Sequence, residues 1–368
     1  MWREDVVMNG LSVSVRRWGL LGLLALLAAC GGGGSGEHPD ASMVAGKWCS
    51  LPGSHGWCLQ TPAAPSDIGV GNVSRVDGLW FFDRKAGMAT TSDGCRRTSD
   101  GGATWSPAQD CGLGKDQQRQ VWFSDDGSVG WALQFWGALY TSTDRGLTWQ
   151  TNIVQNDIPM NAALGFHFVT PQKGWVLRRQ GHWDGLRMLL KTEDGGRTWQ
   201  SVLEQDDAMN SWFGGIAFSH DGKYGVALGG LQGAYLTSDS GVTWVRHTRA
   251  LQAEIARVRF VEGRTFLAVS REGDILRSED GGQSWRVVKQ LPANASPRAF
   301  LELEVLPSGR AYASGGGGLL ISNDGGLTWR EQATGIGRSP QAMHFADDTT
   351  GWIGFEDGAI MATIYGGD

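Results

Sequence analysis

The stretch Thr98-Ser-Asp-Gly-Gly-Ala-Thr-Trp105 is the first of six near-copies of one phrase in this 368-residue chain. Every copy keeps an aspartate, a glycine two positions later, a serine or threonine, and a closing tryptophan. The aspartates are Asp100, Asp144, Asp194, Asp239, Asp280 and Asp324. Their spacing of 41 to 50 residues is typical of one supersecondary unit that is copied many times.

The residues before each phrase form short apolar stretches separated by turn residues, a pattern that predicts four short strands per repeat. Four-stranded units of about 45 residues are typical of β-propeller blades. First-strand signatures begin near residues 78, 120, 165, 215, 257, 301 and 341. No window after Cys30 has a helical period. We therefore expect an all-β, seven-bladed β-propeller over residues 45–368.

The seventh repeat lacks its phrase. It ends at Thr363-Ile-Tyr-Gly-Gly-Asp368, so its blade has no fourth strand of its own. The segments Lys47-Trp-Cys-Ser50 and Gly56-Trp-Cys-Leu-Gln60 precede the first blade and belong to no repeat. We predict that this N-terminal region supplies the missing outer strand and closes the ring, because closure removes exposed sheet edges.

The head of the chain has the pattern of an export signal. Arg16 and Arg17 precede the apolar run Trp18–Ala29, which is too short to span a bilayer. The following Cys30 resembles the lipidated cysteine of a bacterial lipobox; the alternative is an ordinary signal peptide with a chance cysteine. We predict a signal peptide over residues 1–29.

A glycine-rich run, Gly31–Gly36, follows Cys30 and has the composition of a flexible tether. We predict that residues 30–44 form a lipidated tether that holds the folded body beside a membrane. The expected location is the periplasmic face of the cell envelope, at the outer membrane if the host is Gram-negative.

Four further cysteines, an even number, indicate disulfides in an exported protein. Pairing by proximity in the sequence gives Cys49–Cys58 and Cys95–Cys111. A zinc site is the alternative, but the cysteines lack the close pairs that such sites use. We expect no metal and no cofactor.

The repeated phrase Ser/Thr-x-Asp-x-Gly-x-Thr/Ser-Trp is the Asp-box, or BNR repeat. Together with the lead-in to Gly-Trp pairs at 130–131, 174–175 and 351–352, it makes residues 45–368 resemble the photosystem II stability/assembly factor family. The resemblance implies seven blades, export or lipid anchoring, and a role as an assembly helper rather than an enzyme. Sialidases, xyloglucanase-like glycosidases and sortilin-type receptors carry the same motif, so other functions stay open.

We interpret the six Asp-box aspartates as structural, because an aspartate before glycine in a strand–strand turn caps backbone N–H groups. Their turns lie between third and fourth strands, opposite the mouth formed by second-to-third-strand turns and by loops between blades. At that mouth the stretch Arg178-Arg-Gln-Gly-His-Trp-Asp-Gly185 is the longest and most mixed.

Exposed tryptophan beside arginine is typical of binding surfaces, and loops commonly carry function. The structural alternative is a long hairpin whose tryptophan packs on a neighbouring blade and binds nothing. The predicted partner-binding residues are Trp136, Arg178, Arg179, His182, Trp183, Trp212 and Arg271.

Glycoside hydrolysis is the enzymatic alternative, since it needs two carboxylates about 5–10 Å apart. The candidates at the mouth are Asp184, Glu272, Glu356 and Asp357. A sialidase is less favoured, because the Arg-Ile-Pro motif that sialidases share is absent.

The chain has a net charge of −6, and a mildly acidic body is a poor candidate for binding nucleic acid. We expect a non-enzymatic scaffold that contacts the membrane only through its lipid anchor. Its expected partner is an envelope or membrane protein complex, and a surface glycan is the alternative ligand.

Overall fold

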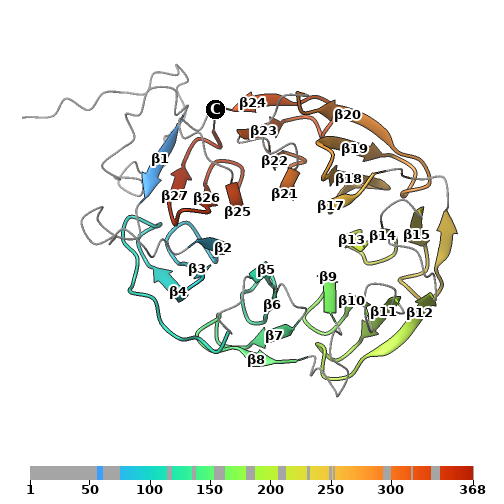
Figure 1. Ribbon diagram of the computed structural model, residues 1–368, viewed down its shortest axis with the longest axis horizontal. Coiled ribbons are helices and arrows are strands. Elements are labelled where there is room, and N and C mark those ends of the chain that lie inside the picture. Colours follow the sequence, from blue (N-terminus) through green and yellow to red (C-terminus); the bar gives the residue numbers. More distant parts are fainter. Residues whose placement is uncertain are drawn as a thin grey trace, which may run out of the picture. The chain divides into compact units, whose positions relative to one another are not determined.

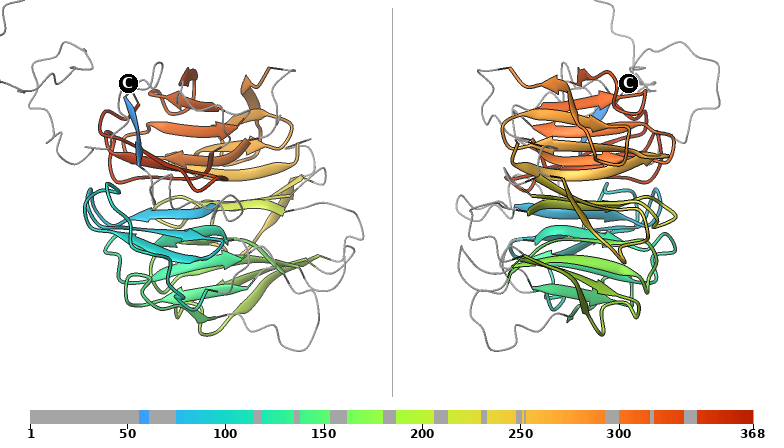
Figure 2. Two further views of the ribbon diagram at one scale, coloured as in Figure 1. Left: turned by 60° about the vertical axis from the view of Figure 1, so that its left-hand side comes forward. Right: turned by 90° about the vertical axis from the view of Figure 1, so that its right-hand side faces the viewer.

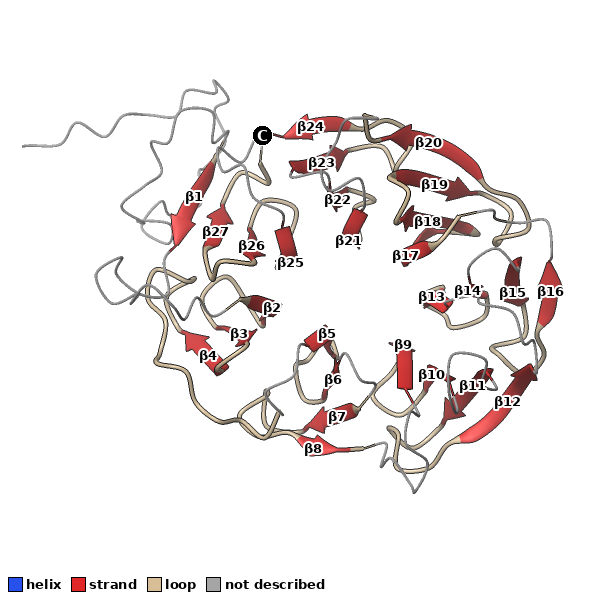
Figure 3. Cartoon of the chain, in the orientation of Figure 1, coloured by secondary structure: helices blue, strands red, loops and turns tan. Residues whose placement is uncertain are grey.

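The computed structural model divides the chain into two units, Met1–Glu37 and His38–Asp368, and all the residues it describes belong to the second. These are residues 56–60, 75–113, 118–134, 138–152, 162–179, 187–205, 213–229, 233–247, 251, 253–292, 300–315, 318–332 and 340–367. The predicted signal peptide, Cys30 and the tether therefore lie outside the described residues. The described elements are strands joined by turns and loops (Figure 3).

Seven sheets surround a common axis, so the predicted seven-bladed propeller is confirmed (Figure 1). Side views show the ring toward its edge, with the orange and red strands of the later blades above the green strands of blades 2 and 3 (Figure 2). The first strand of each blade lies innermost. Blade 1 has β2 (Val76–Phe81), β3 (Gly87–Thr91) and β4 (Gly94–Thr98); blade 2 has β5 (Gln118–Phe123), β6 (Gly130–Gln134), β7 (Leu139–Ser142) and β8 (Gln150–Thr151); blade 3 has β9 (Ala162–Phe168), β10 (Gly174–Arg179), β11 (Arg187–Thr192) and β12 (Gln200–Gln205); blade 4 has β13 (Phe213–Phe218), β14 (Gly225–Gly229), β15 (Gly233–Thr237) and β16 (Val245–His247). Blade 5 has β17 (Ile255–Glu262), β18 (Thr265–Ser270), β19 (Asp274–Ser278) and β20 (Arg286–Gln290); blade 6 has β21 (Phe300–Val305), β22 (Ala311–Gly315), β23 (Gly318–Ser322) and β24 (Arg330–Gln332); blade 7 has β25 (Pro340–Phe345), β26 (Gly351–Phe355), β27 (Ile360–Thr363) and β1 (Trp57–Gln60).

The ring closes as the sequence predicted. β1 pairs antiparallel with β27, with Trp57 opposite Thr363 and Gln60 opposite Ile360. The Trp57 indole is fully buried and meets the Phe345 ring edge-on, with 6.2 Å between ring centroids. Lys47-Trp-Cys-Ser50, the other half of the predicted closing region, lies outside the described residues.

Blade 1 differs from the four-stranded expectation, since β2, β3 and β4 form a three-stranded sheet. The segment after Trp105 follows β4 only loosely: Ser106 N–H donates to Arg97 C=O, and Cys95 and Gln109 exchange two backbone hydrogen bonds. Pro107 lies between these contacts and has no N–H to donate to a ladder. The predicted Cys95–Cys111 disulfide is present and fastens this segment to β4.

The core between blades repeats one aromatic unit. Phe218, at the end of β13, stacks on Trp175 of the preceding blade, with ring centroids 3.7 Å apart. It also meets Trp244, from the Asp-box of its own blade, edge-on at 5.7 Å. A Cβ on Gly225 at the start of β14 would lie 2.5 Å from the Phe218 ring, which explains the glycine. The same stacking joins the last blade to the first, because the ring centroids of Trp352 in blade 7 and Phe81 in blade 1 are 3.4 Å apart.

Candidate functional site

The predicted mouth site is only partly described. Trp136, His182, Trp183, Asp184 and Trp212 lie outside the described residues. Arg179 ends β10, but its side chain is outside them as well. The described members of the predicted set are Arg178 and Arg271, with Glu272, Glu356 and Asp357 among the alternative catalytic candidates.

Arg178 lies near the end of β10, opposite Met188 of β11. Its side chain is half-buried, and this burial lowers the pKa of the guanidinium. Its buried Nε has no hydrogen-bond partner among the described residues. A buried donor without a partner costs free energy, about 1–3 kcal/mol, which an acceptor on a ligand would recover.

Arg271, in the β18–β19 turn of blade 5, is 56% exposed and pairs with Glu254 across 3.3 Å. The neighbouring Glu272 accepts hydrogen bonds from the Glu254 N–H with both carboxylate oxygens, each at 3.1 Å. Asp357 accepts from the Ala359 N–H at 3.3 Å, and Glu356 is exposed in the same turn. Glu272 thus joins its turn to the segment before β17, and Asp357 caps its own turn.

The Asp-box aspartates make one contact pattern six times. Asp239 shows it: one oxygen accepts from the Thr237 hydroxyl at 2.7 Å and from the Thr243 N–H at 2.9 Å, and the other accepts from the Thr243 hydroxyl at 2.5 Å. Hydrogen bonds, first that of the Thr243 hydroxyl, lower the pKa of Asp239 to about 2. These are the contacts of a turn cap. The equivalent bonds to Asp100, Asp144, Asp194, Asp280 and Asp324 are all present.

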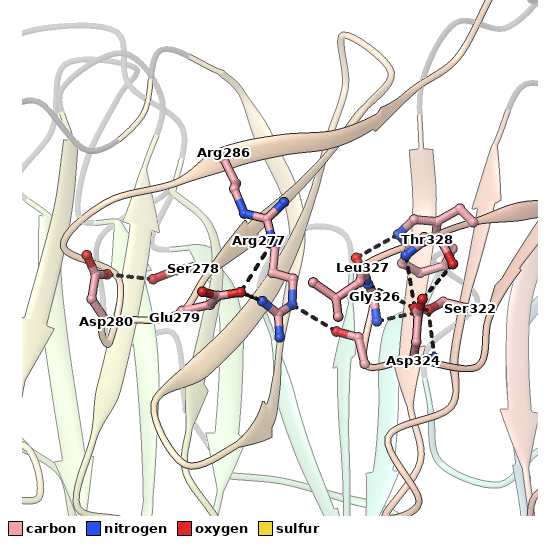
Figure 4. A network of polar contacts seen from close by, with 12 residues as sticks. Arg277, Ser278, Glu279, Asp280, Arg286, Ser322, Asp324, Gly326, Leu327 and Thr328 are labelled. Carbon is pink, nitrogen blue, oxygen red and sulfur yellow. Dashed lines mark hydrogen bonds and ion pairs between the residues drawn. The ribbon is translucent and has the colours of Figure 1, made fainter.

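Arginines link successive Asp-box turns, as Figure 4 shows for blades 5 and 6. Arg277 Nε donates to the Gly325 C=O at 3.0 Å, from β19 to the next blade's turn. Glu279 contacts both Arg277 and Arg286. On the opposite side of the ring, Arg97 donates in the same way to the Arg145 C=O at 2.8 Å. This face of the propeller is therefore occupied by structural contacts.

A cavity of about 220 Å³ lies at the inner strands and was not anticipated from the sequence. The first strands of blades 1, 2, 5, 6 and 7 line it. Its chemically distinctive residues are Trp80, Trp122, Arg259, Glu302, Glu304 and His344. The available signal was the alternation Arg-Val-Arg at 257–259 and Glu-Leu-Glu at 302–304, which puts like charges on one face of an inner strand.

Polar contacts join neighbouring blades at this cavity. Arg257 pairs with Glu302 through two hydrogen bonds of 2.6 and 3.2 Å. Glu304 Oε1 accepts from the Phe345 N–H at 3.0 Å. His344 Nε2 lies 3.0 Å from the Phe81 C=O, so this nitrogen carries the proton. The His344 ring packs on Trp80, with centroids 4.2 Å apart.

Burial keeps two of these groups neutral near pH 7. It raises the pKa of Glu304 to about 8 and lowers the pKa of His344 to about 4. The His344 Nδ1 and Glu304 Oε1 are 3.6 Å apart, too far for a hydrogen bond. Burial also lowers the pKa of Arg259, whose Nη1 donates to the Val258 C=O at 3.0 Å.

Among the described residues, no group of three or more histidine, cysteine or acidic side chains could hold a metal ion. Within the same residues no helix is long and apolar enough to cross a membrane. Cys58 is disulfide-bonded, but its predicted partner Cys49 lies outside the described part of the chain, so that pairing stays a prediction.

Comparison with known proteins identifies similar chains. The family model described as "Photosynthesis system II assembly factor YCF48" matches residues 187–364. The photosystem II assembly lipoprotein Ycf48 of Synechococcus sp. (strain CC9902) is 24% identical over 315 residues, which cover 83% of this chain and 86% of that protein.

Two solved structures have the same fold. YCF48 bound to D1 peptide has a TM-score of 0.59 and 19% identity, over 84% of this chain and 97% of that one. The GH74 xyloglucanase from Xanthomonas campestris also has a TM-score of 0.59, with 14% identity over 84% of this chain and 54% of that one. Because the two scores are equal, similarity of fold does not choose between scaffold and hydrolase. The relatives found by sequence are photosystem II assembly factors, and the chain is similar to that family of Asp-box β-propellers.

Proposed function

We propose that this protein is a non-enzymatic, lipid-anchored scaffold that assists the assembly or stability of a membrane protein complex of the cell envelope. It does so by binding a segment of one subunit at the propeller mouth. The proposal is supported by the relationship over most of the chain to a protein named as a photosystem II assembly lipoprotein. A structure of a YCF48 protein with a D1 peptide provides a precedent in which a propeller of this fold binds a peptide.

The observation that carries a binding role at the mouth is Arg178. Its buried Nε has no acceptor among the described residues. An acceptor on a bound peptide, such as a backbone C=O or a carboxylate, would satisfy it. Trp136, Arg179, His182, Trp183, Trp212 and Arg271 are proposed to complete the surface. Glu272 and Asp357 already accept hydrogen bonds from backbone N–H groups, which favours binding over hydrolysis by those carboxylates.

The anchoring part of the proposal is that residues 1–29 are removed, Cys30 is lipidated, and residues 31–44 form the tether. Cys30→Ser is expected to abolish incorporation of radiolabelled palmitate and to release the protein from membranes. A wild-type protein that takes up no label and fractionates as soluble would contradict the anchor.

The functional test is deletion and rescue in the source cell. Deletion is expected to lower the level of one membrane complex on native gels, with rescue by the wild type but not by Arg178→Ala. Arg246→Ala is the matched control, because Arg246 is an exposed arginine on the outer strand β16. Normal levels of every membrane complex after deletion would refute the scaffold function. Turnover of xyloglucan or sialyl oligosaccharides that is lost in Glu356→Gln or Asp184→Asn would favour the hydrolase instead.

A further inference from the structure

Side-chain hydrogen bonds join the inner strands where the end of the ring meets its beginning. Glu304 on β21 of blade 6 accepts from the Phe345 N–H on β25 of blade 7, at 3.0 Å. His344, also on β25, donates from Nε2 to the Phe81 C=O on β2 of blade 1, at 3.0 Å. A titratable side chain therefore joins blade 7 to each of its two neighbours. We call this pair of contacts the inner junction.

The two titratable side chains of the inner junction are close to each other and shielded from water. His344 is 9% exposed, and its Nδ1 is 3.6 Å from Glu304 Oε1. Because Nε2 carries the proton that is donated to Phe81, Nδ1 has a lone pair and can take up a second proton. Ionisation of Glu304 would therefore put a poorly solvated carboxylate beside an unprotonated ring nitrogen, which costs free energy.

The groups that surround the inner junction do not offset its burial. Burial raises the pKa of Glu304 to about 8, although the Phe345 N–H and the charge of Arg259 on β17 both lower it. Burial also lowers the pKa of His344 to about 4, although its contact with the Phe81 C=O raises it. The other charged groups that line the cavity beside the junction are two paired carboxyl groups, Glu302 with Arg257 and Asp77 with Arg75.

The closed and the open junction hold different numbers of protons. When it is closed, the pair of Glu304 and His344 keeps one dissociable proton from about pH 4 to about pH 8. When it is open to water, the ordinary pKa values of 4.5 and 6.5 apply, so the pair keeps one proton only between those two values. From pH 6.5 to pH 8 the closed junction therefore holds more protons than the open one. The state that holds more protons loses stability as pH rises, so closure is favoured most between pH 4.5 and pH 6.5 and weakens toward pH 8.

We propose that the inner junction is a pH-sensitive device, which takes up a proton as blade 7 closes against blades 6 and 1 and which loosens as the surroundings become alkaline. Blade 7 is also the blade that β1 completes, so loosening weakens from the inside the joint that β1 closes from the outside. This proposal does not rest on the proposed scaffold function.

The test is urea unfolding of the full chain between pH 4 and pH 9, with each variant compared with the wild type so that shared groups cancel. Glu304→Gln keeps an acceptor for the Phe345 N–H but cannot ionise. Relative to this variant, the wild-type unfolding constant should rise with pH above 4.5, by up to about tenfold per pH unit, and level off near pH 8. His344→Gln keeps an N–H donor but cannot be protonated. Relative to it, the wild-type unfolding constant should fall from pH 4 to pH 6.5, again by up to about tenfold per unit, and then level off. The control Glu331→Gln, at an exposed carboxyl on the outer strand β24, should follow the wild type at every pH.

Hydrogen exchange on the wild type tests the junction without mutation. The Phe345 amide is the one that Glu304 accepts from, and its exchange is expressed as a protection factor, which removes the intrinsic pH dependence of exchange. Protection at Phe345 should fall by up to about 30-fold between pH 6.5 and pH 8. The control is the Phe218 amide, which also ends the first strand of its blade, β13, and which should keep its protection.

Infrared spectroscopy identifies the proton itself. The difference spectrum between the wild type and Glu304→Gln at pH 6 should contain the C=O band of a protonated carboxyl group, and this band should disappear above pH 8. Three results would overturn the proposal: the same pH dependence in Glu304→Gln as in the wild type, no protonated-carboxyl band at pH 6, or equal loss of protection at Phe218 and Phe345.

Discussion

Removing the Trp57 side chain should open the seam where the two ends of the propeller meet. Trp57→Ala deletes an indole that is 0% exposed and packs against Phe345 in the cluster that includes Tyr312 and Phe355. Burying about 200 Å² of indole at about 25 cal/mol per Å² is worth about 5 kcal/mol. Buried tryptophan-to-alanine substitutions cost about 3–5 kcal/mol. We therefore expect a loss of about 4 kcal/mol in the free energy of unfolding.

The assay is the urea midpoint of wild type and variant, followed by hydrogen exchange of the β27 amides. Since β1 is the outer neighbour of β27, exchange at Ile360–Thr363 should accelerate more than exchange in blade 4. Val287→Ala is the control, because this residue is also on an outer strand but is 48% exposed, and it should change stability by less than about 0.5 kcal/mol. A loss below about 1 kcal/mol for Trp57→Ala, with unchanged exchange at β27, would refute the closing role of β1.

Three further predictions concern the turns and the first blade. The double variant Cys95→Ala/Cys111→Ala, which opens a bridge of sequence separation 16, should lose about 3 kcal/mol in urea unfolding; unchanged stability would mean that Pro107 and the backbone contacts hold the segment by themselves. Ser240 has a φ of 62° at a position where four other Asp-boxes have glycine. Ser240→Gly should therefore raise the free energy of unfolding by up to about 1 kcal/mol, and Gly281→Ala at the equivalent position should lower it. Hydrogen bonds hold the pKa of Asp194 and Asp239 at about 2, below the unfolded value near 4, so their contribution to stability is complete above about pH 4 and falls as pH drops toward 2; a urea midpoint that is flat between pH 5 and pH 2 would contradict this.

Most of the fold could be predicted because it depends on short, repeated sequence relations. The aromatic residue that ends a first strand lies over the glycine that begins the second, so the pair Phe218 and Gly225 can be recognised from the sequence alone. The closing strand was predictable by subtraction, because blade 7 lacked one strand and Trp57 belonged to no repeat. The missing fourth strand of blade 1 was not predictable by this reasoning, since the Asp-box of that blade is intact and strand pairing is interrupted only after it, at Pro107.

The cavity could not be predicted, because it is assembled from blades that are distant in the chain. Asp77 and Glu304 lie in blades 1 and 6, and only ring closure puts them around one space. In the sequence, their charges also fit the usual alternation of charged and apolar residues on a half-exposed strand, and only the structure shows that they are buried. The mouth residues were predicted from loop length and composition, and most of them fall outside the described residues, so Arg178 carries that site.

The attachment of the outer segment of blade 1 depends on the redox conditions around the protein. With the Cys95–Cys111 bond intact, residues 106–111 shield the free side of β4. In a compartment rich in glutathione the bond would be reduced, and β4 would be left with an unpaired row of amides that could recruit a strand from another molecule. Export to an oxidising compartment, as proposed above, would keep this bond formed and the edge of β4 covered.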